Sequence, residues 1–149
     1  MKFGELVQAM VEGDVPPAPV MELVGMRITE VEPGRTVFEL EAGPQHANPM
    51  GTLHGGILAD VADAAMGSAY ASRLDEGESF TTLELKLNFL RPFWSGRLVA
   101  TGEVVDAGRT VGLVSCRIVD EKGRLIAHAT STCMTLRGDV TREVADGSS

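Results

Sequence analysis

The part of the sequence best suited to chemistry runs from Asn48 to Asp63. Two consecutive glycines, Gly55 and Gly56, open a stretch of helical character, and Asp63 follows eight residues after the first of them. Uncovered N–H groups at a helix N-terminus lie at the positive end of the helix dipole, where they can bind a developing oxyanion. An aspartate in an alanine-rich, apolar helix is poor for helix propensity and costly to bury. A simple pair of N-terminal glycines with a solvent-facing Asp63 explains the same pattern without any chemistry.

Several common catalytic and cofactor motifs are absent from the sequence. It has no G-x-S-x-G segment for a hydrolase nucleophile, no Walker A lysine and no G-x-G-x-x-G between a strand and a helix. The three histidines, His46, His54 and His128, lack the spacing of metal ligands. We therefore expect neither a metal site nor an organic cofactor.

The composition is that of one globular domain. The chain has 149 residues, of which 44% are hydrophobic, and no apolar run approaches the roughly 20 residues that span a bilayer. A net charge of -8 argues against a general nucleic-acid binder. Most basic residues nevertheless lie within residues 86–137, which suits a small phosphorylated ligand. A solvated face of strands explains that pattern equally simply.

The N-terminus and the cysteines indicate a cytoplasmic protein. Glu5, Gln8 and Glu12 interrupt the region where a signal peptide needs a continuous apolar stretch. Two cysteines, Cys116 and Cys133, do not make a disulfide framework. We expect both to be reduced thiols that pack as small buried hydrophobic side chains.

Hydrophobic periodicity divides the chain into an N-terminal helix with its linker (residues 1–18), one domain (19–137) and a polar tail (138–149). One long helix is predicted over 55–73. Its apolar face comprises Leu58, Val61, Ala62, Ala65 and Ala69, and the opposite side carries Asp60, Asp63, Gly67 and Ser68. Strands are predicted at 26–31, 35–41, 80–90, 97–106, 110–119 and 124–136.

The order of these elements predicts an α+β fold, in which about six antiparallel strands curl around one long helix. Short connectors predict that the last four strands pair as a meander. In the 80–90 strand, one face carries Leu83, Leu85, Leu87 and Phe89, and the other carries Thr82, Glu84, Lys86 and Asn88.

The stretch N-x-x-G-x-x-H-G-G, with an acid nine residues after the histidine, resembles the hotdog-fold acyl-CoA thioesterases. The resemblance is greatest to the phenylacetate-degradation type and extends over about residues 20–137. The run from Leu85 to Pro92 is also similar to the first strand after the helix in such proteins. The resemblance implies a hotdog fold and hydrolysis of an acyl-CoA thioester, without metal or organic cofactor.

The resemblance also implies roles for individual residues. The N–H of Gly55, beside Gly56 in the substrate site, would polarise the thioester carbonyl, and Asp63 would act as general base or nucleophile. Asn48 would orient water or substrate, and Thr82 would hold the attacking water or the carboxylate. His54 would brace the turn before the helix. Related enzymes have a glutamate where Asp63 stands.

Asp60 is a second candidate for the catalytic acid, because it lies closer to the glycines on the same side of the helix. The spacing of the motif favours Asp63. We interpret Asp60 as a solvated carboxylate that interacts favourably with the helix N-terminus.

Helix geometry indicates that one chain cannot supply the whole site. Eight residues of helix separate the backbones of Gly55 and Asp63 by roughly 12 Å, whereas both groups must come within about 3 Å of the reacting group. We therefore expect a homodimer in which Gly55 of one subunit works with Asp63 of the other, as the family also implies. A tetramer formed as a dimer of dimers is the expected assembly.

Other parts of the substrate suggest further candidates. The phosphates of coenzyme A would be bound by some of Lys86, Arg91, Arg97 and Arg109, each of which is otherwise a surface charge. The acyl pocket has four candidates, for which plain core packing is the simpler interpretation: Tyr70, Phe80, Leu58 and Met66.

Two further functions fit the same fold. One is a non-catalytic acyl-CoA-binding or sensing module, although a binder has no need of the acid at position 63. The other is a hotdog dehydratase or hydratase, although the sequence has no H-F-P-type motif.

Overall fold

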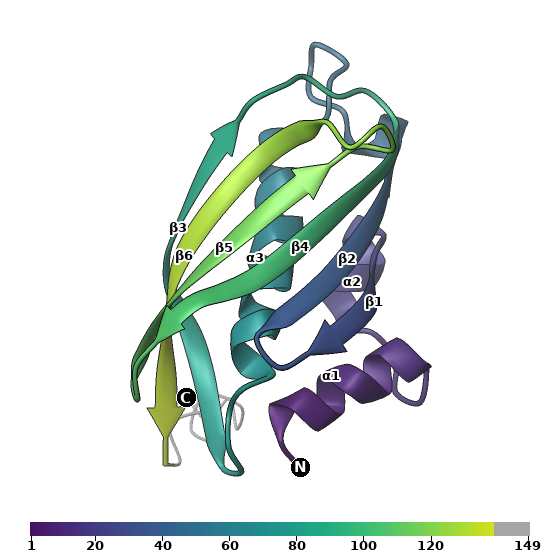
Figure 1. The fold of residues 1–149 in the computed structure, drawn as a ribbon. Helices are drawn as coiled ribbons and strands as arrows, with labels where there is room; N and C mark the ends of the chain where they lie inside the picture. Colours follow the sequence, from purple (N-terminus) through teal and green to yellow (C-terminus); the bar gives the residue numbers. More distant parts are fainter. Residues whose placement is uncertain (139–149) are drawn as a thin grey trace, which may run out of the picture.

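A long central helix, α3 (Gly55–Ala71), packs across the inner face of an antiparallel sheet in the computed structural model, which describes residues 1–138 (Figure 1). Within these residues the sheet has six strands, and the predicted α+β hotdog architecture is confirmed. The predicted tail at 138–149 lies outside the described residues, apart from Gly138. The other elements are α1 (Phe3–Glu12), α2 (Pro19–Val24), β1 (Met26–Glu32), β2 (Arg35–Ala42), the 3₁₀ turn η1 (Pro44–His46), β3 (Glu78–Phe89), β4 (Gly96–Ala107), β5 (Val111–Val119) and β6 (Leu125–Arg137).

The strand order is β1-β2-β4-β5-β6-β3, so the predicted meander is only partly right. Strands β4, β5 and β6 follow one another through short turns, but β3 pairs with β6 at the far edge of the sheet. The chain between β3 and β4 crosses over the end of the sheet (Figure 1). This crossing lets β4 pair with β2. A sheet that closes around a helix needs such a connection, which local turn signals do not reveal.

The helix boundaries follow from capping. Helix α3 ends at Ala71, two residues before the predicted end, where the Ser72 hydroxyl donates a hydrogen bond to the Ala69 carbonyl at 2.7 Å. All five residues of the predicted apolar face are buried. Gly67 differs from the prediction because it is also buried, against the ring of Phe80. None of the helices within residues 1–138 is long and apolar enough to cross a bilayer.

Helix α3 comes very close to the sheet at Ala65. The buried Thr36 hydroxyl on β2 donates a hydrogen bond to the Ala65 carbonyl at 2.7 Å. Gly102 on β4 is the register partner of Thr36 and lies under the same carbonyl, because a Cβ built on Gly102 would collide with it. These contacts from β2 and β4 therefore fix the distance between the helix backbone and the sheet at Ala65.

We predict that Gly102→Ala lowers the free energy of unfolding by about 3 kcal/mol, because the added methyl group meets backbone that cannot move aside. Urea unfolding would measure the change. Gly108→Ala is the matched control, since its Cβ would have only ordinary contact, at 3.6 Å, with the Val111 carbonyl. Equal unfolding free energies for the two variants would contradict this packing.

Candidate active site

The start of α3 is held by His54, which caps the helix. His54 Nδ1 accepts a hydrogen bond from the Gly56 N–H at 2.8 Å, and this satisfies one of the free donors of the first turn. A Cβ on Gly56 would lie 2.9 Å from that same nitrogen, so the second glycine leaves room for the cap. His54 therefore holds the turn that leads into α3.

Gly55 offers a backbone donor with no partner among residues 1–138. The hydrogen bonds of the first helical turn start from Gly56 and Ile57, which leaves the Gly55 N–H directed out of the helix. The ring of Phe89, on β3, lies over Gly55 so closely that a Cβ there would be 2.8 Å from the ring. The glycine thus lets an aromatic side chain approach the helix N-terminus. The sequence did not single out Phe89 for this contact.

A pocket of about 360 Å³ opens beside this N-terminus. Asn48, Gly55, Leu58 and Arg91 all line it, so the structure brings four predicted site residues together. Its remaining lining is Thr52, Leu53, Phe89, Leu90, Pro92 and Phe93.

Asn48 holds the loop that leads to the helix. Its side-chain oxygen accepts hydrogen bonds from the N–H groups of Met50 at 2.9 Å and Thr52 at 3.2 Å. Its amide group donates to the Thr52 hydroxyl at 2.8 Å. Because an amide has two N–H donors, one of them is still available to a ligand in the pocket.

Asp63 and Thr82 form a direct pair on the side of α3 that faces β3. The Thr82 hydroxyl donates a hydrogen bond to Asp63 Oδ1 at 3.0 Å. The Asp63 side chain is otherwise exposed within this chain, so its second carboxylate oxygen is accessible. Asp60 is exposed as well, and no described side chain donates to its carboxylate.

A β-bulge explains how Thr82 reaches the helix. The sequence placed Thr82 on the same face as Glu84, and this prediction was wrong. In the β3–β6 register Thr82 is opposite Cys133 and Glu84 is opposite Thr132, so Leu83 is the extra residue. The bulge re-aims the strand and puts Thr82 on the inner face together with Leu85. The sequence does hold a signal, because large apolar residues change phase between Phe80 and Leu83.

The remaining predicted binding residues lie apart from this group. Lys86 is opposite Thr130 and is exposed on the outer face of the sheet. Tyr70 is buried about 22 Å along the helix from Gly55. Its hydroxyl lies 2.6 Å from the Thr135 hydroxyl. The structure does not bring either residue to the pocket beside Gly55.

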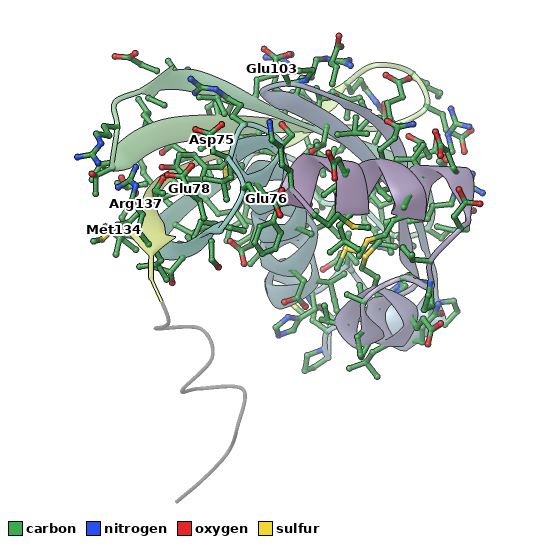
Figure 2. The ribbon with its side chains drawn as sticks, turned by 90° about the horizontal axis from the view of Figure 1, so that it is seen from below. Asp75, Glu76, Glu78, Glu103, Met134 and Arg137 are labelled. Atoms are coloured by element: carbon green, nitrogen blue, oxygen red, sulfur yellow. The ribbon has the colours of Figure 1, made fainter. Side chains whose placement is uncertain are left out.

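Tyr70 lines a different pocket of about 350 Å³, which also contains Arg109. Figure 2 shows this end of the molecule, where Glu78 of β3 and Arg137 of β6 form an ion pair at 2.8 Å. A backbone hydrogen bond from the Asp75 N–H holds the pKa of Glu78 below its usual range, although burial acts in the opposite direction, and the charge of Arg137 lowers this pKa further. These contacts join the ends of two strands.

Among residues 1–138, no group of three or more histidine, cysteine, aspartate or glutamate side chains could hold a metal ion. The groups that the described residues do offer are a backbone N–H donor at Gly55 and the Asp63 carboxylate with its hydroxyl partner Thr82. Both can act on an electrophilic carbonyl.

Comparison with known proteins agrees with this chemistry. Residues 50–127 match the family model described as the thioesterase superfamily. The chain belongs to the thioesterase superfamily. The matched region contains Gly55, Asp63 and Thr82, and the predicted class of enzyme, a thioester hydrolase, is confirmed.

Three relatives illustrate the likeness. A phenylacetic acid degradation-related protein from Ralstonia eutropha JMP134 is 32% identical, with a TM-score of 0.79 over 86% of this thioesterase and 98% of that chain. A 1,4-dihydroxy-2-naphthoyl-CoA hydrolase from Listeria monocytogenes is 29% identical over 76% of this chain and 92% of its own. Human acyl-coenzyme A thioesterase 13 is 28% identical, over 86% and 90%. The resemblance to the phenylacetate-degradation type is thereby confirmed.

Proposed function

We propose that this thioesterase hydrolyses the thioester of an aryl- or medium-chain acyl-CoA to the free acid and coenzyme A. The single observation that supports the proposal best is the pairing of Asp63 with Thr82, on the same helix whose first amide is unpartnered. Two of the relatives carry names of enzymes that act on CoA esters, one of them an aromatic ester. Catalysis then needs no metal or organic cofactor.

In the proposed mechanism the Gly55 N–H donates to the carbonyl oxygen of the thioester and stabilises the negative charge that develops there. Asp63 takes a proton from water while the water oxygen bonds to the carbonyl carbon. The C–S bond then breaks, the CoA sulfur takes the proton that Asp63 holds and leaves as the free thiol, and the carboxylic acid is released. Direct attack by Asp63, through an anhydride that water then hydrolyses, uses the same residues.

We infer that the active unit is a homodimer joined through β3. Within residues 1–138, β3 pairs with β6 on one side only, so its other edge is free. Large apolar side chains on and beside this edge are exposed in the single chain: Leu83 at 54%, Phe89 at 60% and Leu90 at 50%. A free edge with apolar side chains is suited to pairing with a second strand. A second copy of β3 would cover it and bring the two halves of the site together.

The contacts along β3 select a register for this dimer. In a shared site, Gly55 of one subunit must meet Asp63 of the other. Because Phe89 lies against Gly55 and Thr82 lies against Asp63, Phe89 must then come near Thr82 of the partner subunit. Twofold antiparallel registers that do so are centred on Leu85 or on Lys86. The first places Glu84 opposite Lys86 of the partner subunit, and the second places two Lys86 side chains opposite each other. Because like charges in this position are destabilising, we favour the register centred on Leu85.

We assign the phosphates of coenzyme A to Arg91 and Lys122. Arg91 lines the pocket at the helix start, where it donates to the Leu125 carbonyl at 2.9 Å. Lys122 lines the neighbouring pocket, which shares Phe93 with the first. Within the described chain neither side chain has a carboxylate partner, whereas Arg124 is paired with Asp120 at 2.7 Å. Two unpaired cations on either side of Phe93 suit a diphosphate better than the outer-face Lys86 does.

A non-catalytic acyl-CoA-binding module remains the alternative, and it would bind CoA esters without releasing thiol. The cytoplasmic location and the tetramer stay predictions of the sequence.

We predict that Asp63→Asn lowers kcat for thiol release from a panel of aryl- and alkyl-CoA esters by about 100-fold or more, because it removes the proton acceptor. Asp60→Asn is the matched control on the same helix and should retain activity. A large loss of kcat in Asp60→Asn, with activity retained in Asp63→Asn, would move the catalytic role to Asp60. Binding of CoA esters without any release by the wild type would favour the binding module.

We predict that Gly55→Pro lowers kcat at least 100-fold below that of Gly55→Ala, since only proline removes the N–H. Both side chains displace the same exposed Phe89 ring. Proline suits the first helical position, and the extended backbone of His54 (φ -64°, ψ 134°) suits a residue before proline. Mixing inactive Gly55→Pro and Asp63→Asn subunits should restore about a quarter of wild-type activity through random dimers with one intact site. No restoration would contradict a shared site.

We predict that Glu84→Lys or Lys86→Glu alone weakens the dimer, because each change places like charges opposite one another across the proposed β3 pair. The double exchange should restore dimerisation. Sedimentation velocity over a concentration series would measure the dimer dissociation constants of the wild type and the three variants. Single variants that dimerise as well as the wild type would exclude the register centred on Leu85.

We predict that Arg91→Gln combined with Lys122→Gln raises KM for the CoA ester about tenfold with little effect on kcat, because two contacts to phosphate are lost. The KM for the matching N-acetylcysteamine thioester, which has no phosphates, should not change. Arg117→Gln, which removes an exposed cation on β5 away from both pockets, is the control. An equal rise in KM for both thioesters would place the defect in the pocket rather than at the phosphates.

A further inference from the structure

Three polar side chains form a continuous row of hydrogen-bond contacts behind Asp63, a polar file made of Thr82, Cys133 and Ser131. Thr82 Oγ1, which donates to Asp63 Oδ1 at 3.0 Å, lies 4.0 Å from the sulfur of Cys133. The same sulfur lies 3.9 Å from the hydroxyl oxygen of Ser131. Both distances are within hydrogen-bonding range for sulfur. The file thus crosses from β6 through β3 to the central helix.

The inner two members of the file are unusual for their position. Ser131 and Cys133 are both 0% exposed and point inward from β6, among side chains such as Ala127 and Ala129. A buried hydroxyl without a partner is unfavourable, and among residues 1–138 the Ser131 hydroxyl has only the sulfur of Cys133 as a side-chain partner. An alanine at either position would match its neighbours without this requirement. The file is therefore a feature that core packing alone does not need.

The donors in the file have a definite order. Thr82 has a single hydroxyl proton, and that proton is directed to Asp63. The Thr82 oxygen can then only accept from Cys133, which requires a protonated thiol. Burial raises the pKa of Cys133, and the charges of Asp63 and Glu84 raise it further, although the hydrogen-bond contacts with Ser131 and Thr82 act in the opposite direction. The thiol is therefore neutral at physiological pH and can donate.

We propose that Cys133, supported by Ser131, is a positioning residue that keeps the Thr82 proton directed at Asp63. With its oxygen engaged by the thiol, Thr82 cannot rotate its proton toward water or backbone. Asp63 then accepts through Oδ1 and presents Oδ2 to the reacting water. This inference rests on the proposed function, because it assigns the file a role in holding the catalytic acid. It gives a buried cysteine a part in the reaction in which its sulfur never touches substrate.

The first test compares kcat and KM of Cys133→Ala with those of Cys116→Ala, using a CoA ester that the wild type hydrolyses. Cys116 is an equally buried thiol on β5 whose pKa is raised to about 12 by burial, so its loss reports the effect of a smaller side chain in the core. We expect Cys133→Ala to lower kcat about three- to fivefold with KM unchanged, and Cys116→Ala to leave both unchanged. Cys133→Ser, which keeps a donor, should have a higher kcat than Cys133→Ala. Thermal unfolding of each variant separates these effects from loss of folded protein.

The deciding experiment repeats Cys133→Ala in a Thr82→Val background. Once the hydroxyl is gone the thiol has nothing to orient, so the second change should alter kcat by less than about 1.5-fold. Equal effects of Cys133→Ala with and without Thr82 would overturn the inference, because they would show a role independent of the hydroxyl. So would identical kinetics of Cys133→Ala and Cys116→Ala. A wild type that hydrolyses no thioester would instead overturn the proposed function, so the two failures are distinct.

Discussion

The contact between the Ala65 carbonyl and the sheet is the constraint on which the rest of the structure depends. Thr36 bonds this carbonyl and Gly102 leaves space for it, so the height and rotation of α3 over β2 and β4 are set at one point. Asp63 lies two residues earlier on the same helix, about 3 Å along its axis. The small residues Ala62, Ala65 and Ala69 allow the close approach and are all fully buried. The position of the carboxylate is therefore a consequence of how tightly the helix backbone packs.

The bulge at Leu83 turns the Thr82 side chain of β3 toward the Asp63 carboxylate. Without it Thr82 would share the outer face with Glu84, and Asp63 would have no partner from β3. The bulge also leaves Leu83 exposed at the free edge, next to the strand positions that we assign to the dimer. One extra residue thus serves both the Asp63–Thr82 hydrogen bond and the proposed interface. The polar file through Cys133 begins at the register position directly opposite Thr82.

The glycine pair illustrates how steric and chemical requirements coincide. Gly56 leaves room for the His54 cap, and Gly55 leaves room for the Phe89 ring, so both glycines have packing reasons that need no catalysis. The result is still a helix N-terminus with one amide directed outward. Gly55 and Asp63 are eight residues apart, about 12 Å along the helix, so in the proposed mechanism each chain supplies two half-sites. An exposed apolar edge on β3 is the physical reason for expecting a second copy to complete them.

The sequence by itself determined the main elements and the class of enzyme, because both depend on local pattern. Helical spacing marked α3 and its buried face, alternation marked the strands, and the family resemblance of the stretch from Asn48 to Asp63 implied roles for Gly55, Asp63 and Thr82. Tertiary structure alone decided which strands are neighbours, since the pairing of β3 with β6 depends on a crossing at the end of the sheet. It also decided the face of Thr82, because a bulge is a property of two strands in register. The placement of Tyr70 and Lys86 away from the pocket, and of Cys133 behind Thr82, followed from contacts between residues far apart in the chain, which no local pattern contains.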